Sequence, residues 1–360
     1  IIMSEDNVLK SSNSQCANCG GNLTFNPAPQ KLKCLNCGRE FGFNRTRKQV
    51  KHLIKETNEN ASSHREWAKD LKAVRCNTCG AKVMLSGLEI TQKCPYCGSD
   101  YVVDTDSLAG LKPDVVLPFS ITEQQAGELF KKVVKKKLFV PRSFKKNLPI
   151  ENIRGLYLPI FTFDADAYVE YDGELDKDKA KKTSKGETVK YTETFRIYGD
   201  KTFYQRDWVS ESSSKISQKD INELLPFDFN ETYAYTNDFL RGYPVEHYEE
   251  SMMSNYRDTQ ECMKTQMKSD ILSQYDYDRV KTFNMKISWS NELYSYRLMP
   301  VYCIDLKYKN KPYNTYVNGQ TGKVGKGYPV SLLKKILFFG GIAIIAIGII
   351  ILLLWANKAF

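Results

Sequence analysis

Cysteines are the residues of this chain whose spacing most clearly indicates chemistry. Eight of the ten cysteines occur in four C-x2-C pairs, and the other two, Cys262 and Cys303, stand alone. The pairs form two sets with one formula, C-x2-C-x14-C-x2-C. This spacing is typical of sites in which four thiolates hold one zinc ion. The predicted ligands are Cys16, Cys19, Cys34 and Cys37 in the first set, and Cys76, Cys79, Cys94 and Cys97 in the second.

The two sets favour structural zinc over catalytic or redox chemistry. Four protein ligands leave no open position for a reactive water, and a redox role for one pair would leave the other three unexplained. A glycine follows the second cysteine of every pair, where the chain must turn sharply with a positive φ. We therefore predict two small zinc ribbons, residues 1–41 and 76–104, joined by a helical or flexible connector over residues 42–75.

The C-terminal region predicts a membrane anchor. Residues 336–355 contain neither a charge nor an amide side chain, and a helix of that length spans about 30 Å, the hydrocarbon thickness of a bilayer. Lysines are more frequent before this segment than after it, so the positive-inside rule places the N-terminal bulk in the cytoplasm. The cytoplasm is also a reducing compartment, in which eight cysteines stay available as thiolate ligands. The lysines before the segment are Lys323, Lys326, Lys334 and Lys335, and only Lys358 follows it.

Residues 112–330 predict one mixed α+β domain with an antiparallel sheet. Thr122 and Gln125 form a capping-box pattern, and apolar residues follow at helical spacing through Val134. The other face of this helix carries Lys131, Lys132, Lys135, Lys136 and Lys137. That face is either simply solvated or turned to an anionic membrane surface or nucleic acid. A second helix is predicted from Pro244 to Ser273, and residues 172–187 form a charged hairpin tip between strands.

One internal repeat stands out within this domain. Residues 157–164, YLPIFTFD, match residues 298–305, LMPVYCID, in their order of apolar, proline, aromatic and aspartate positions. A proline inside a strand indicates a sheet edge or a bulge. The repeat predicts two related α+β halves that share one sheet.

The remaining candidate catalytic residues are weak. Asp164 and Asp305 occupy equivalent positions of the repeat, with Asp166 nearby, but aspartates at strand ends are usually turn formers rather than acid/base pairs. His247 and Cys262 would lie on one helix about 22 Å apart, too far to form a nucleophile pair. Residues 319–327, GQTGKVGKG, lack the spacing of a phosphate-binding loop. The sequence predicts no enzyme.

Composition is compatible with a folded, mildly basic protein. The formal charge is +10, and two four-thiolate zinc sites would lower it to about +6. Charged residues make up 26% and hydrophobic residues 42%, which argues against disorder throughout the chain. The first residues are mostly polar and show no secretory signal. We expect Met3 to be the natural start, which leaves Ile1 and Ile2 as additions.

The combination of motifs resembles a bacterial family of membrane-anchored, TFIIB-type zinc-ribbon proteins, the YdjG-like proteins. The features that carry the resemblance are the paired cysteine sets, KPDVVLPFSI, LPIFTFDADAYVEYDG, and MPVYCIDLKYKNKPYNTYVNGQTGKV before the apolar helix. The resemblance implies a single-pass protein of the bacterial cell membrane. It also implies partners among SPFH (flotillin-like), TPM-domain and PspA-type envelope-stress proteins, in a hetero-oligomer.

Two functions are compatible with these features. The first is a non-enzymatic adaptor that holds protein partners at the cytoplasmic face of the membrane. The second is nucleic-acid binding by the ribbons, with the anchor holding DNA or RNA near the membrane. The second function requires a dense basic surface. The ribbons carry only a few cations, offset by acids such as Glu89 and Asp100. Charge therefore favours the adaptor.

Overall fold

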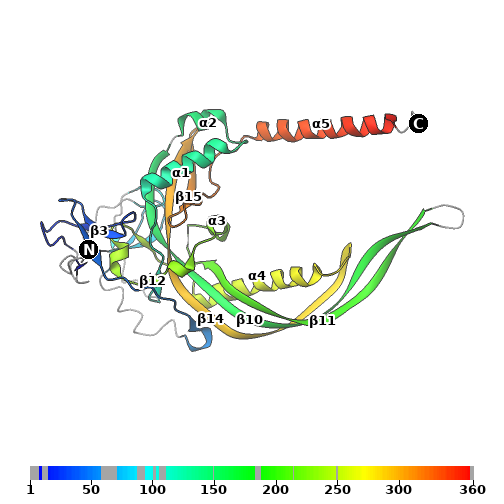
Figure 1. The fold of residues 1–360 in the computed structure, drawn as a ribbon, viewed down its shortest axis with the longest axis horizontal. Helices are drawn as coiled ribbons and strands as arrows, with labels where there is room; N and C mark the ends of the chain where they lie inside the picture. The colour runs from blue at the N-terminus through cyan, green and yellow to red at the C-terminus, as the bar shows by residue number, and fades with distance from the viewer. Residues whose placement is uncertain are drawn as a thin grey trace, which may run out of the picture.

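The computed structural model describes residues 8–9, 15–57, 71–86, 94–99, 103–104, 111–148, 150–182, 188–213, 215–248 and 250–356. Ile1, Ile2, part of the connector, part of the second ribbon, the end of the charged hairpin and Lys358 lie outside these ranges. The described chain is α+β, with two N-terminal four-cysteine clusters and one apolar C-terminal helix, which confirms the predicted fold class. Figure 1 shows the N-terminal strands around β3 at one end of the molecule and the C-terminal helix at the other.

The first ribbon is a small sheet of its own. Its strands have the order β1-β4-β3-β2, and β2 and β3 form the hairpin between the two cysteine pairs. Leu23, Phe25 and Leu32 alternate with more exposed neighbours and are buried. The strand bounds are Val8–Leu9 for β1, Leu23–Asn26 for β2, Lys31–Cys34 for β3 and Glu40–Phe43 for β4.

The second ribbon belongs to the main sheet. Its strands are β6 (Leu71–Arg75), β7 (Lys82–Ser86) and β8 (Val103–Asp104), and β7 pairs with β13 (Val245–Glu246). In the described residues the main sheet has the strand order β12-β9-β14-β10-β13-β7-β6-β8. Three more strands pair with members of this series: β11 pairs with β10, and both β15 and β5 pair with β14. The further bounds are Tyr233–Ala234 for β12, Val115–Val116 for β9, Arg279–Tyr308 for β14, Ile150–Lys182 for β10, Thr188–Glu211 for β11, Lys311–Asn318 for β15 and His52–Leu53 for β5.

The connector differs from its prediction. Strand β5 pairs with Leu293 and Tyr294 of β14, and a 3-10 turn, Ile54–Glu56, buries Ile54. Strand β6 falls within the range predicted as connector, yet it pairs with β7. The polar composition concealed these pairings, because both strands are short and the partner of β5 lies about 240 residues along the chain.

The internal repeat forms the centre of the sheet. Strands β10 and β14 run antiparallel, and Leu158 lies opposite Met299, which are equivalent positions of the two repeats. The outer neighbours follow the same symmetry. Short parallel β13 contacts β10 at Tyr157, and short parallel β9 contacts β14 at Leu298, the position equivalent to Tyr157. The two halves therefore share one sheet, related by an approximate local two-fold axis between Leu158 and Met299.

The repeat prolines lie in central strands, contrary to the expectation of an edge or a bulge. On its outer side β10 changes partner from β13 at Tyr157 to β11 at Ile160, and Pro159 lies in the interval. Strand β14 likewise changes partner from β9 to β15 around Pro300. A proline has no N–H to donate, so it is tolerated where the neighbouring strand is exchanged.

Beyond the repeat, three strands continue as a long arm, which we define as residues 166–182 of β10, 188–205 of β11 and 279–290 of β14. The predicted charged hairpin tip is therefore mostly strand. Helix α4, Met252–Leu272, packs along one face of the arm, and Figure 1 shows it beside these strands. This helix begins eight residues later than predicted from Pro244, because residues 245–246 form β13 and Ser251 caps the helix.

Three further helices complete the domain. Helix α1, Glu123–Lys136, has the predicted capping box of Thr122 and Gln125, and it buries Ala126, Phe130 and Val134 while its lysines are exposed. Helices α2, Arg142–Asn147, and α3, Gln218–Leu224, are short. The C-terminal helix α5 covers Leu332–Ala356.

Candidate metal centres and the networks that hold them

The structure brings each predicted set of four cysteines together. Within each set the four Sγ atoms lie within 4.8 Å of one another. In the first cluster the Sγ–Sγ distance is 3.7 Å for Cys16 and Cys37 and 3.5 Å for Cys19 and Cys34. A tetrahedron with Zn–S bonds of about 2.3 Å has sulfur–sulfur separations of about 3.8 Å. The clusters therefore have the size of four-thiolate metal sites.

Each cysteine pair forms the same backbone turn. In the pair at Cys16, the N–H of Gly20 donates to the carbonyl of Cys16 at 2.8 Å, and the N–H of Cys16 donates to Gly21 at 2.7 Å. The other three pairs repeat both bonds. The glycine of each turn has φ between 70° and 75°, a conformation in which other residues are strained. The sequence prediction for these glycines is confirmed.

The thiols of the first cluster influence one another's ionisation. A hydrogen bond from the backbone of Arg39 lowers the pKa of Cys37 to about 6, and one from Cys37 lowers that of Cys34. The pKa of Cys19 rises to about 12, because its sulfur neighbours outweigh a favourable bond from Gly21. Four thiolates at this spacing repel one another, so a bound cation is what would keep all four ionised.

The first ribbon is packed against the main domain by aromatic rings. Phe239, in the 3-10 turn Asn237–Leu240, is fully buried, and its ring centroid lies 5.5 Å from that of Phe25 and 5.0 Å from that of Phe43. The N–H of Phe25 also donates to the carbonyl of Arg241 at 2.9 Å. Gly242 has φ +85°, and a Cβ there would lie 2.1 Å from Thr24 Oγ1. The ribbon is therefore a fixed part of the domain.

The second ribbon is held by an ion pair beneath one cysteine turn. The guanidinium of Arg154 donates to the carbonyl of Pro95, which lies between Cys94 and Cys97, at 3.1 Å. The same guanidinium pairs with Asp305, and both side chains are mostly buried. Burial raises the pKa of Asp305, while Arg154 lowers it. The role of Asp305 is therefore to hold Arg154 under the second cluster.

A buried carboxylate forms a second link on this side. Glu246 of β13 accepts hydrogen bonds from the hydroxyls of Tyr96, next to Cys97, and of Ser213, the latter at 2.7 Å. Glu246 and Tyr96 are both buried. Glu211 lies in the same region, and burial raises its pKa to about 7. Sequence reasoning missed Glu246, because its partners Tyr96 and Ser213 are 150 and 33 residues away along the chain.

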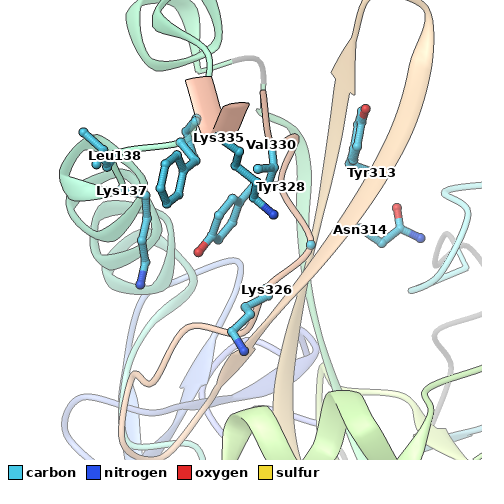
Figure 2. Close-up of a pocket in the computed structure, with 11 residues that line it drawn as sticks. Lys137, Leu138, Tyr313, Asn314, Lys326, Tyr328, Val330 and Lys335 are labelled. Atoms are coloured by element: carbon cyan, nitrogen blue, oxygen red, sulfur yellow. The ribbon is translucent and has the colours of Figure 1, made fainter. Parts of the chain in front are cut away.

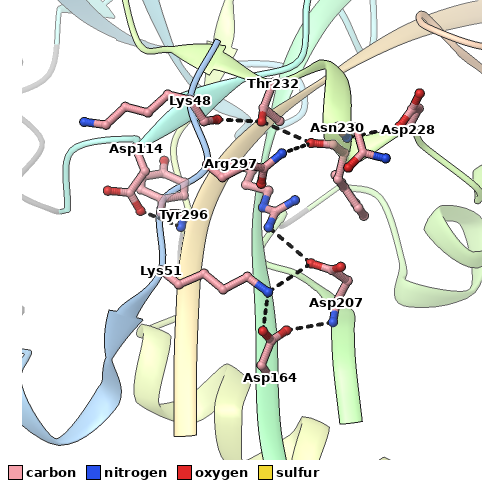
Figure 3. Close-up of polar contacts among 12 residues, drawn as sticks. Lys48, Lys51, Asp114, Asp164, Asp207, Asp228, Asn230, Thr232, Tyr296 and Arg297 are labelled. Carbon is pink, nitrogen blue, oxygen red and sulfur yellow. Dashed lines mark hydrogen bonds and ion pairs between the residues drawn. The ribbon is translucent and has the colours of Figure 1, made fainter. Parts of the chain in front are cut away.

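The connector is held by a network of charges around a buried arginine (Figure 3). Arg297 is 1% exposed, donates to Asp207 at 3.2 Å and lies over the ring of Phe229 at 4.5 Å. Lys51 of the connector pairs with Asp164, which also accepts from the N–H of Asp207 at 2.8 Å. Burial lowers the pKa of Arg297, and Asp207 opposes that effect. No motif in the sequence indicated this network.

The candidate catalytic residues are dispersed. Asp164 lies opposite Leu293, and Asp305 lies opposite Asn152, so the two are twelve strand positions apart. At about 3.3 Å per residue this separates them by about 40 Å. His247 precedes α4, contrary to the prediction that it shares a helix with Cys262, and Cys262 is exposed while Cys303 is buried. Asp166 accepts from Arg206 and Asn291, each at 2.6 Å.

Helix α5 is long and apolar enough to cross a membrane. The segment Leu332–Ile351 has a mean hydropathy of 2.2, and no part of it is buried against the rest of the described protein. The 25 residues of α5 give a length of about 37 Å. The helix begins four residues before the predicted span of residues 336–355.

Comparison with known proteins finds a relative in Bacillus subtilis. The chain is 29% identical over 241 residues to a protein of Bacillus subtilis (strain 168) named uncharacterized protein YdjG. The alignment covers 66% of this chain and 70% of that protein. No protein-family model matches the chain, and no solved structure matches it.

Proposed function

We propose that this chain is a non-enzymatic adaptor of the bacterial cell membrane, anchored by α5 with its N-terminal bulk in the cytoplasm. The observation that carries the proposal is an unburied apolar helix attached to a domain with two four-cysteine clusters. A helix of this composition exposed to water would be strongly unfavourable, at about 25 cal/mol per Å² of apolar surface. Lys334 and Lys335 at its start suit the cytoplasmic side.

The clusters are proposed to hold one zinc ion each, with a structural role. Cysteine thiolates and tetrahedral spacing suit zinc, and a reducing cytoplasm keeps the thiols available. Each ribbon already uses one face to pack against the domain, so the ribbons act as parts of a single rigid unit. Their outer turns are still available to partners. Leu35, between Cys34 and Cys37, is 67% exposed.

The arm is the proposed surface for protein partners. Within the described residues, β11 pairs only with β10, so its outer edge along the arm has no partner strand. Such an edge is a template for strand addition. Tyr198 and Tyr204 on β11 are 82% and 71% exposed, and exposed tyrosines are enriched at protein interfaces. By resemblance, the partners are SPFH (flotillin-like), TPM-domain and PspA-type proteins in a hetero-oligomer.

The arm also constrains how the protein meets a bilayer. Figure 1 shows α5 and the arm extending toward the same side of the domain. The arm carries charged pairs such as Arg279 with Asp178 and Lys281 with Glu174, so it stays outside hydrocarbon. In the anchored protein the arm therefore lies on the cytoplasmic side of the bilayer.

Crosslinking and affinity capture from native membranes test the adaptor role. Two variants gain the same charge on the same arm: Tyr198→Lys with Tyr204→Lys on β11, and the control Ser288→Lys with Ser290→Lys on β14. Ser288 and Ser290 are exposed and lie on the other edge strand. We expect the β11 variant to lose its captured partners and the control to keep them. Equal capture by both variants would remove the arm edge from the proposal.

A further inference from the structure

A cavity lies where α5 leaves the domain (Figure 2). Its volume is about 570 Å³, within the range of about 300–1,000 Å³ typical of ligand sites. Figure 2 shows Tyr328 between the end of α1 and strand β15. The walls come from the α1–α2 junction, from Tyr313 and Asn314 on β15, and from the segment after β15. Of the eleven described residues that line it, Lys335 alone belongs to α5.

The lining combines apolar surface with positive charge. Apolar walls are formed by Leu138, Val330 and the ring of Tyr328, and none of the described lining residues is acidic. Lys137 and Lys335 also line it, and their ammonium groups form no ion pair with the part of the chain that the structure describes. Lys326, the third lining lysine, pairs with Glu223 at 3.3 Å. The cavity therefore offers two available cations beside apolar walls.

The position of the cavity favours a membrane lipid over a soluble anion as its ligand. Leu138, Val330, Leu332 and Leu333 around it are 59%, 44%, 73% and 66% exposed, which is apolar surface of the kind buried at a membrane. The uncharged part of α5 begins at Ile336, directly after the lining residue Lys335, so the cavity lies at the level of the lipid headgroups. Lys131, Lys132, Lys135 and Lys136, on the helix that leads to the cavity wall, are also exposed.

We propose that this cavity binds one anionic phospholipid of the cytoplasmic leaflet. Lys137 and Lys335, from different walls of the cavity, attract its phosphate, and Leu138, Tyr328 and Val330 contact its glycerol and the start of an acyl chain. The inference rests on the proposed membrane anchoring, and it adds a specific lipid ligand to it. A bound lipid would fix the domain relative to the bilayer, because the walls come from both the α1–α2 junction and the segment that leads into α5.

Native mass spectrometry of the full chain in neutral detergent tests the site. Phosphatidylglycerol, phosphatidylcholine and inorganic phosphate are titrated separately. We expect one retained phosphatidylglycerol per chain, with affinity at least about tenfold above that for phosphatidylcholine, and about a fivefold loss for each of Lys137→Ala and Lys335→Ala. The control Lys131→Ala removes an exposed lysine of α1 that does not line the cavity, and we expect it to change affinity less than twofold. Val330→Trp, which fills the cavity without a change of charge, should abolish retention.

Three results would overturn the lipid site. They are equal retention of the two lipids, full competition by inorganic phosphate, and a Lys131→Ala effect as large as that of Lys137→Ala. The anchor is tested separately by alkaline carbonate extraction of membranes. A chain that resists extraction but retains no phosphatidylglycerol loses only the lipid site. A chain released by carbonate loses the proposed anchor itself.

Discussion

Replacing Phe239 by alanine tests whether the first ribbon is a fixed part of the domain. Phe239 is fully buried between Phe25 and Phe43 of the ribbon and Tyr233 of the domain, with ring-centroid distances of 5.5, 5.0 and 5.6 Å. Truncating a phenylalanine in such a site removes its transfer free energy and leaves a cavity, at a cost of about 3–5 kcal/mol. That is a large part of the 5–15 kcal/mol that typically stabilises a folded protein.

The assay is urea unfolding of the detergent-solubilised full chain, followed by tyrosine and tryptophan fluorescence, with zinc measured by elemental analysis. We expect the free energy of unfolding to fall by about 3–5 kcal/mol while two zinc ions per chain remain, because no ligand is altered. Zinc in the first ribbon should exchange faster with a chelator, since an undocked ribbon opens more often. The control is Leu35→Ala. Leu35 is a ribbon side chain that is 67% exposed, and its loss should cost less than about 0.5 kcal/mol.

Two results would refute this reasoning. A loss below about 1 kcal/mol would show that the rings do not hold the ribbon to the domain, because a surface substitution alone reaches about 0.5 kcal/mol. Loss of a zinc ion in Phe239→Ala would show that docking and metal binding are one event.

Three further predictions concern the clusters and the acids near them. Cys19→Ser and Cys79→Ser occupy equivalent ligand positions, and each should lower the zinc content from two ions to one; a content that stays at two would exclude the assigned ligands. Arg154→Met should cost about 3 kcal/mol in unfolding experiments and speed zinc loss from the second ribbon only, since it leaves Asp305 buried without its partner; recovery in Arg154→Met with Asp305→Leu would show the coupling. Burial raises the pKa of Glu211 from 4.5 to about 7, so its contribution to stability is complete below pH 4.5 and is lost as the pH rises through about 7. Glu211→Gln should flatten that decline and raise stability at pH 8 by on the order of 1 kcal/mol after allowance for solvent screening, and an unchanged pH profile would contradict the assignment.

Some features follow from the sequence because their causes are local. The four cysteine turns need only a C-x2-C-G segment, and the predicted glycines do have positive φ. Thr122 and Gln125 are three residues apart, so the capping box of α1 is visible as a pattern. The uninterrupted apolar run predicts α5 to within four residues at its start. The repeat likewise indicated two halves of one sheet, because matching motifs favour matching strands.

Other features depend on partners that are distant along the chain. The polar connector gave no sign that His52 and Leu53 would pair with β14, some 240 residues later. Arg297 reads as an ordinary charged residue in a strand, yet the fold buries it against Phe229 and Asp207. The predicted start of α4 was wrong because residues 245–246, which the prediction placed in the helix, form strand β13.

Sequence alone determined which residues can ligate a metal, which segment is apolar enough to enter a bilayer, and which two segments repeat. Tertiary structure decided that the repeats pair about Leu158 and Met299, that both ribbons are built into the domain, and that a cavity with two available lysines lies at the root of α5. The physical reason is the distance along the chain over which each kind of interaction acts. Spacing, capping and hydropathy act over a few residues, whereas register, burial of charge and the shape of a cavity depend on which distant segments meet.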